Sequence, residues 1–116
     1  MYHELKHKIC IIGLGYVGLP LAIEFSKYYK VVGYDKSNKR VKELSKGLDH
    51  NNEIKLSKIN TKKILFTNQE KDLSDCNIFI ITLPTPVKKN NIPDLEDVIN
   101  GTKLVSKYIS KNNFII

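Results

Sequence analysis

The sequence has few cysteines, no tryptophan and no long apolar run, and these absences exclude several classes of protein. Two cysteines in 116 residues are too few for a scaffold held together by disulfides. No apolar stretch approaches the roughly 20 residues that span a bilayer, and the N-terminal MYHELKHK lacks the apolar segment of a secretory signal. Hydrophobic residues make up 41% and charged residues 27%, which is a globular composition. We expect a single soluble, cytoplasmic domain over residues 1–116, with no membrane partner.

Arginine is nearly absent, although the chain is basic. The net charge is +7, from 19 Lys and Arg against 12 Asp and Glu, yet Arg40 is the only arginine. Arginine is the side chain best suited to reading bases and to binding phosphates through two parallel hydrogen bonds. The lysines are dispersed and do not alternate with aromatic residues. We therefore expect no nucleic-acid partner, and a solvated lysine-rich surface is the simpler interpretation. The three histidines lack the spacing of metal ligands, so no metal site is expected.

Short apolar runs alternate with helical patterns along the chain. The runs predict strands at 8–12, 30–34, 64–67 and 77–82, with another beginning at 114–116. Helices are predicted at 16–27, from a Ser37 cap to a Gly47 stop, at 53–59, and from an Asp94 cap to Ser110. The apolar face expected of the last helix consists of Leu95, Val98, Ile99, Thr102, Val105 and Ile109.

This alternation is typical of an α/β domain of the Rossmann type, a doubly wound parallel sheet covered on both faces. The strand predicted fourth along the chain should lie next to the first, at the point where the strand order reverses. The final strand is not followed by a helix. We therefore expect a fragment of a longer protein that stops after the start of its fifth or sixth strand.

A G-x-G-x-x-G motif lies between the first predicted strand and the first predicted helix, which is the context that a dinucleotide site requires. Its residues are Gly13, Leu14, Gly15, Tyr16, Val17 and Gly18. Gly13 would permit a tight turn, Gly15 would let the backbone approach a pyrophosphate, and Gly18 would let helix and strand pack closely. The pyrophosphate would lie on the free N–H groups at the positive end of the helix dipole.

Asp35 follows the second predicted strand, 20 residues after Gly15, where dinucleotide sites place a carboxylate on the adenosine ribose. A carboxylate there repels a 2′-phosphate, so NAD is favoured over NADP. Lys36 and Arg40 weaken that preference, because cations near the ribose could tolerate a phosphate. S-adenosylmethionine is an alternative ligand of similar geometry, and a chance glycine turn beside a surface Asp is the simplest alternative.

A breaker cluster follows the fourth predicted strand and consists of Leu83, Pro84, Thr85 and Pro86. Because ligands of open α/β sheets bind beyond the carboxyl ends of the strands, residues 83–87 should face the cofactor, with the Thr85 hydroxyl directed at it. An inert proline turn is the alternative interpretation of this segment.

Taken together, these motifs resemble the N-terminal NAD-binding domain of the UDP-glucose/GDP-mannose dehydrogenase family. The resemblance rests on KICIIGLGYVGLPLAIEF at 8–25, on VGYD at 32–35 with Arg40 beyond it, and on TLPTP at 82–86 with PDL at 93–95. The last two segments are most similar to the branch that acts on UDP-N-acetylhexosamines in surface-polysaccharide pathways.

The resemblance implies an NAD-dependent enzyme that oxidises the C6 alcohol of a UDP-sugar to a carboxylate, with two NAD⁺ reduced. Residues 13–18 would hold the pyrophosphate, Asp35 the ribose, and Arg40 would lie near the adenosine end, while residues 83–87 would line the cofactor. The catalytic residues of the family lie beyond the matched segment, so this chain should bind NAD and catalyse nothing alone. Cys10 and Cys76 are expected to be buried structural thiols. A homodimer is implied for the full-length protein.

Two other functions remain open on the sequence. A stand-alone nucleotide-sensing module needs the same fold and no catalytic residues. The NAD domain of another oxidoreductase, such as a hydroxyacid dehydrogenase, would share the glycines and Asp35 but not residues 82–86.

Overall fold

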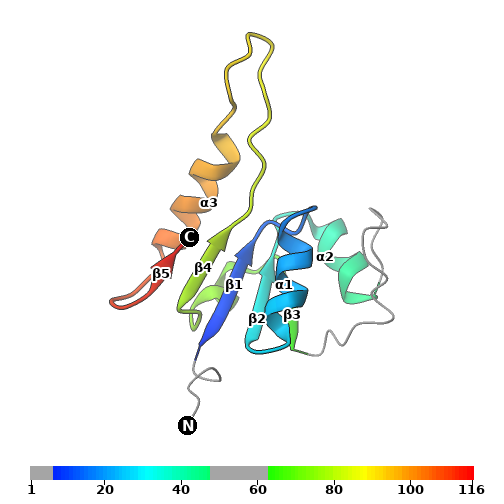
Figure 1. The fold of residues 1–116 in the computed structure, drawn as a ribbon, viewed down its shortest axis with the longest axis vertical. Helices are drawn as coiled ribbons and strands as arrows, with labels where there is room; N and C mark the ends of the chain where they lie inside the picture. The colour runs from blue at the N-terminus through cyan, green and yellow to red at the C-terminus, as the bar shows by residue number, and fades with distance from the viewer. Residues whose placement is uncertain (1–6, 48–62) are drawn as a thin grey trace.

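Five parallel strands form one sheet, as shown in Figure 1, in a computed structural model that describes residues 7–47 and 63–116. The strands are β1 (Lys8–Ile12), β2 (Lys30–Tyr34), β3 (Ile64–Thr67), β4 (Ile78–Ile81) and β5 (Phe114–Ile115). Their order across the sheet is β3-β2-β1-β4-β5. β1 therefore pairs with β2 on one side and with β4 on the other, so the predicted reversal of strand order lies at β1. The predicted doubly wound parallel sheet is confirmed.

Helices cover both faces of the sheet. The helical segments are α1 (Gly18–Ser26), α2 (Asn38–Ser45), the 3₁₀ turn η3 (Glu70–Leu73) and α3 (Glu96–Ser106). On one face, α1 and α2 bury Leu19, Ile23 and Leu44 against Ile9 and Ile11. On the other face, η3 and α3 bury a second cluster, which consists of Cys10, Ile12, Val32, Leu73, Cys76, Phe79 and Val105. None of the helices in the described ranges is long and apolar enough to cross a bilayer.

The first two helices agree closely with their predicted positions, with one correction. α1 begins at Gly18 rather than Tyr16, because Tyr16 and Val17 belong to the preceding turn and are 67% and 65% exposed. α2 has the predicted cap, since the Ser37 hydroxyl accepts a hydrogen bond from the Arg40 amide at 3.1 Å. Gly47 follows the end of α2 with φ +78°, the left-handed conformation expected of a glycine stop. The helix predicted at 53–59 lies outside the described residues.

The last helix differs more from its prediction. α3 begins at Glu96 and ends at Ser106, so it is shorter at both ends than predicted. The Asp94 carboxylate accepts a hydrogen bond from the Glu96 amide at 3.0 Å, but Leu95 occupies the cap position. The predicted apolar face is wrong at Leu95, Ile99 and Thr102, which are all exposed. Leu95 and Ile99 are about half exposed, at 50% and 49%, and the sheet is contacted by the side of α3 that carries Val105.

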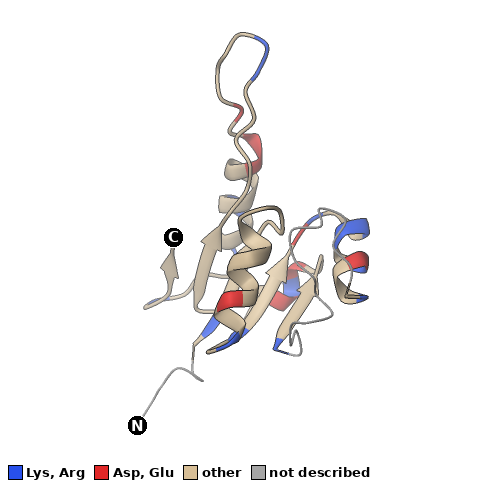
Figure 2. Ribbon diagram, turned by 45° about the vertical axis from the view of Figure 1, so that its right-hand side comes forward, with Lys and Arg blue, Asp and Glu red and all other residues tan. Residues whose placement is uncertain are grey.

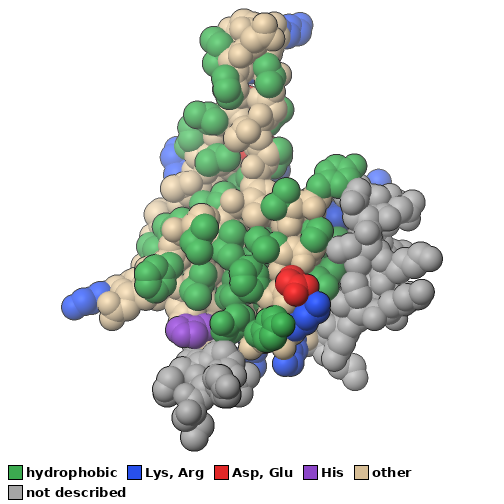
Figure 3. All heavy atoms as spheres, viewed as in Figure 1, with side chains coloured by type: hydrophobic (Ala, Val, Ile, Leu, Met, Phe, Trp, Pro, Cys, Tyr) green, Lys and Arg blue, Asp and Glu red, His purple; other side chains and the backbone are tan. Residues whose placement is uncertain are grey.

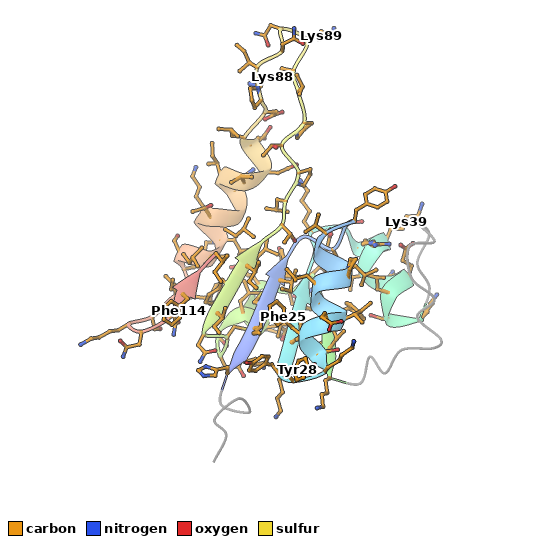
Figure 4. All side chains as sticks on the ribbon, viewed as in Figure 1. Phe25, Tyr28, Lys39, Lys88, Lys89 and Phe114 are labelled. Atoms are coloured by element: carbon orange, nitrogen blue, oxygen red, sulfur yellow. The ribbon has the colours of Figure 1, made fainter. Side chains whose placement is uncertain are left out.

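Between β4 and α3 the chain extends away from the body as a finger, residues 83–95 (Figure 1). Its two sides meet where Val87 and Pro93 form an antiparallel bridge. Lys88 and Lys89 lie near its tip in Figure 4, and Figure 2 shows acidic residues at the start of α3, at the base of the finger. Apolar side chains also lie along the finger in Figure 3, and Val87 and Ile92 are 65% and 55% exposed. The finger leaves the sheet at the carboxyl end of β4.

Candidate cofactor site

A pocket of about 1010 Å³ opens at the carboxyl ends of β1, β2 and β4, where the fold predicts a ligand. Its lining comes from the glycine turn, from the ends of β2 and β4, and from one side of α3. The motif residues that line it are Gly13, Leu14, Gly15, Tyr16 and Val17; Asp35, Lys36, Leu83 and Pro84 line it as well. Predicted site residues from three separate segments thus lie around one cavity, whereas the predicted residues Gly18, Arg40, Thr85 and Pro86 do not line it.

Hydrogen bonds from three neighbouring segments fix the start of the glycine turn. The Gly13 amide donates to Tyr34 O at 2.8 Å, and the Leu14 amide donates to Asp35 Oδ2 at 3.0 Å. Arg40 Nε donates to Leu14 O at 2.8 Å, and the Thr82 hydroxyl donates to Gly13 O at 2.7 Å. All four polar backbone groups of residues 13 and 14 are therefore satisfied by the protein itself.

The amides that follow have no such partners. In the described part of the chain, the N–H groups of Gly15, Tyr16, Val17 and Gly18 donate no hydrogen bond to backbone or side chain. Gly15, Tyr16 and Val17 are exposed and line the pocket. Four unpaired amides at the positive end of a helix dipole form an environment that favours an anion.

The three glycines of the motif differ in what an added Cβ would meet. At Gly13, where φ is +98°, it would lie 2.9 Å from the Leu83 side chain. At Gly18 it would lie only 1.7 Å from Gly13 O. At Gly15 it would meet no atom within 4 Å, and the φ of Gly15 is not positive. Conformation and packing thus require glycine at 13 and 18, whereas Gly15 leaves open space at the pocket, as the close approach of a diphosphate to the backbone requires.

Asp35 lies at the other side of the turn, at the end of β2. Its Oδ2 accepts from the Leu14 amide, and its Oδ1 accepts from the Ser37 amide at 2.9 Å. These two bonds fix the carboxylate at the edge of the pocket. Each carboxylate oxygen retains a lone pair that could accept a ribose hydroxyl. Tyr34, the preceding residue, also lines the pocket, and burial raises the pKa of its phenol, so it remains a neutral hydrogen-bond donor.

The two cations near Asp35 are engaged elsewhere. Lys36 Nζ forms an ion pair with Asp97 Oδ1 of α3 at 3.2 Å. Arg40 pairs with Glu43 as well as with Leu14 O, and its side chain is only 13% exposed. Arg40 does not line the pocket, so the structure places it behind the glycine turn. Its observed contacts fix the turn from outside the cavity.

On the β4 side, the four predicted residues separate into two pairs. Leu83 and Pro84 line the pocket, and the Leu83 side chain lies against Gly101 of α3. Thr85 and Pro86 are exposed at the base of the finger and do not line the pocket. The threonine that does line the pocket is Thr82, which sequence reasoning did not select. Its only sequence signal is its position, as a polar residue directly after a buried strand.

The two cysteines take no part in the site. Cys10 is fully buried in β1, and Cys76 is 3% exposed just before β4. Two causes raise the pKa of Cys10 far above its usual value: the larger is its hydrogen bond with the Cys76 thiol, and the second is burial. The expectation of buried structural thiols is confirmed. No cluster of three or more potential metal ligands occurs among the residues described.

Known proteins share this sequence pattern. The profile of the UDP-glucose/GDP-mannose dehydrogenase family, NAD binding domain, matches residues 7–116. The chain is 41% identical over 110 residues to a UDP-N-acetyl-D-glucosamine 6-dehydrogenase of Salmonella typhi, and 38% identical over 110 residues to one of Pseudomonas aeruginosa. In both comparisons the alignment covers 94% of this chain and 26% of the relative. The chain thus spans about a quarter of the length of these relatives.

The fold is shared as well. The structure of a UDP-D-ManNAc dehydrogenase from Pyrococcus horikoshii superposes with a TM-score of 0.85 at 32% sequence identity. This match covers 93% of the present chain and 27% of that protein.

Proposed function

The chain belongs to the UDP-glucose/GDP-mannose dehydrogenase family as its NAD-binding domain, and from this premise we propose that it holds NAD⁺ while a UDP-N-acetylhexosamine is oxidised at C6. The relatives at 41% and 38% identity carry the name UDP-N-acetyl-D-glucosamine 6-dehydrogenase, which supports this choice of sugar. The proposed reaction converts the C6 alcohol to a carboxylate through two hydride transfers to two NAD⁺. We place it in the cytoplasm and assign it to a homodimer of the full-length enzyme.

One observation carries the proposal: the unpaired amides of residues 15–17 and the fixed Asp35 carboxylate line one pocket. A diphosphate needs backbone donors, and the neighbouring ribose needs an acceptor for its hydroxyls. In NAD these two groups are adjacent. The nicotinamide would then extend toward Leu83 and Pro84, which line the pocket at the end of β4.

The same geometry favours NAD over NADP. Asp35 places a negative charge where NADP carries its 2′-phosphate. Arg40 is held in its buried pair with Glu43 and does not line the pocket, so it does not offset that repulsion. Lys36 lines the pocket, and its exposed ion pair with Asp97 is weak, so the preference for NAD rests on the charge of Asp35 and Lys36 reduces it.

Within this proposal the chain contributes cofactor binding rather than chemistry. The cofactor accepts the hydride, and the protein orients it and excludes water. Cys10 and Cys76 are buried in the core behind the sheet, and the neighbouring Cys76 thiol together with burial raises the pKa of Cys10, so neither is placed to serve as the nucleophile of the aldehyde-oxidising step. The nucleophile and the sugar pocket are assigned to the three quarters of the relatives that this chain does not match.

Calorimetric titration with NAD⁺ and with NADP⁺ tests the proposal. The wild-type chain should bind NAD⁺ more tightly than NADP⁺. Asp35→Ala removes the ribose acceptor, and hydrogen bonds to a charged group contribute about 1.5–3 kcal/mol each, so NAD⁺ affinity should fall about 10–100-fold. The preference of the variant for NAD⁺ over NADP⁺ should also be smaller, because the carboxylate that repels the 2′-phosphate is lost.

Two further variants sharpen the result. Asp35→Asn removes the charge and keeps an oxygen acceptor for only one of the Leu14 and Ser37 amides, so its comparison with Asp35→Ala shows how much of the effect a remaining neutral acceptor restores. Asp75→Ala is the matched control, because Asp75 is an exposed carboxylate that pairs with Lys8 at 2.8 Å at the other end of β1. Equal affinities of wild type and Asp35→Ala for both cofactors would contradict the assignment of Asp35 to the ribose.

A further inference from the structure

Thr82 follows β4 directly, beside the end of β1. Its backbone amide donates to Ile12 O at 2.9 Å, which continues the ladder between the two strands. Its hydroxyl oxygen lies 3.0 Å from Ile12 O and 2.7 Å from Gly13 O, so its single proton is directed at these two carbonyls. Ile12 O already accepts a hydrogen bond from the Thr82 amide. Gly13 O depends on the hydroxyl alone, and its distance to the hydroxyl is the shorter of the two.

The Gly13 carbonyl has little alternative to this donor. Among the hydrogen bonds of the described residues, it accepts the one from Thr82 alone. It also lies against α1, since a Cβ added to Gly18 would be 1.7 Å from Gly13 O and 2.5 Å from Thr82 Oγ1. This oxygen is enclosed between the hydroxyl and the first residue of α1. Without the hydroxyl, the carbonyl stays unsatisfied or the peptide rotates.

Rotation of that peptide would reach the pocket. Gly13 O and Leu14 N belong to the same peptide plane, and Leu14 N donates to Asp35 Oδ2. Turning the plane would break that bond and redirect the unpaired amides from Gly15 onward. The Thr82 hydroxyl and the Asp35 carboxylate thus hold opposite edges of one peptide, and both ends of the cofactor site depend on its orientation.

We infer that Thr82 is a positioning residue of the cofactor site: its hydroxyl holds the Gly13–Leu14 peptide so that the amides of residues 15–17 face the diphosphate. The inference rests on the proposed NAD⁺ function. It assigns to Thr82 the hydroxyl role that the sequence pattern suggests for Thr85, which lies exposed outside the pocket. Thr82 acts through Gly13 rather than by touching the reacting atoms.

The test compares Thr82→Val, which keeps the shape and loses the hydroxyl, with Thr82→Ser, which keeps the hydroxyl. Thr102→Val is the matched control, because the Thr102 hydroxyl also donates to a backbone carbonyl, Val98 O at 2.7 Å, on the exposed side of α3. NAD⁺ affinity is measured by calorimetry. The ³¹P shifts of the bound diphosphate are recorded at saturating NAD⁺, and unfolding is followed in urea.

Thr82→Val should weaken NAD⁺ binding about tenfold or more and shift the ³¹P signals of the bound diphosphate. Thr82→Ser and Thr102→Val should stay within about twofold of wild type, because each leaves the Gly13 contact intact. If Thr82→Val does not fold, Thr82→Ala replaces it, and the contrast with Thr82→Ser is the same.

Wild-type affinity in a folded Thr82→Val, or an equal loss in Thr82→Ser, would overturn the role of Thr82 and leave the NAD⁺ site standing. Failure of the wild-type chain itself to bind NAD⁺ would overturn the proposed function, and this inference with it.

Discussion

Alanine at Gly15 and alanine at Gly18 should have opposite effects, although the two glycines lie in one motif. The reason is the space around each. An added methyl at Gly15 meets nothing within 4 Å, whereas at Gly18 it would lie 1.7 Å from the Gly13 carbonyl oxygen. Gly15→Ala should therefore leave the fold intact and obstruct the cofactor. Gly18→Ala should damage the fold first.

The magnitudes follow from these distances. Gly15 has no positive φ, so alanine there should stabilise by about 0.4–1 kcal/mol through the lower entropy of the unfolded chain. At Gly18 a backbone oxygen must move, which places the cost at or above the upper end of the usual overpacking range, about 3 kcal/mol. For a domain of this size, that cost lowers Tm by about 12 °C or more. At Gly15, the loss of one charge-assisted hydrogen bond to the diphosphate should weaken NAD⁺ binding about 10–100-fold.

Urea unfolding and calorimetric titration of the two variants provide the measurement. The expected pattern is a stable Gly15→Ala that no longer binds NAD⁺ well, and a destabilised Gly18→Ala. Gly47→Ala is an instructive control, since Gly47 also has open space but requires a left-handed φ of +78°; it should lose stability without any steric contact. A stable Gly15→Ala that binds NAD⁺ with wild-type affinity would refute the reasoning.

Two further outcomes follow from side chains outside the pocket. Ser37→Ala removes the cap of α2, whose hydroxyl accepts the Arg40 amide, and should lower the free energy of unfolding by about 1 kcal/mol in urea denaturation; no change would show that the cap contributes nothing. Cys10 and Cys76 should be inert to a disulfide reagent such as DTNB at pH 8 in the native protein, and both should react in denaturant, because burial and their mutual hydrogen bond keep Cys10 protonated. Rapid labelling of the folded chain would contradict this.

The strands and the first half of the site are the parts that the sequence could predict. Buried parallel strands have no polar face, so KICII and NIFIIT are recognisable without any partner. The glycine turn and Asp35 are separated by one β-α-β unit of regular length, and such spacing is set by local geometry. The positions of these residues are set by segments that lie close together in the sequence, so the sequence alone predicts them.

The remainder depends on contacts that periodicity does not encode. Tyr16 and Val17 continue an apolar helical pattern but lie in the exposed turn. Leu95 and Ile99 fit the apolar face of α3, yet both are about half exposed and lie beside finger residues such as Pro93 rather than in the core clusters against the sheet. The sequence pattern favours Thr85 over Thr82, because it does not encode the contact between the Thr82 hydroxyl and Gly13 O, which joins residues 69 positions apart.

The fixed start of the glycine turn has an energetic consequence for the ligand. Its hydrogen bonds to Tyr34, Asp35, Arg40 and Thr82 exist before any cofactor arrives, so the entropy of ordering that loop is part of folding rather than of association. Linkage makes the relation reciprocal, since a ligand that binds only the native state adds RT ln(1 + [L]/Kd) to its stability. A dinucleotide bound between β2 and β4 would therefore hold the two halves of the sheet together at β1, the strand that they share.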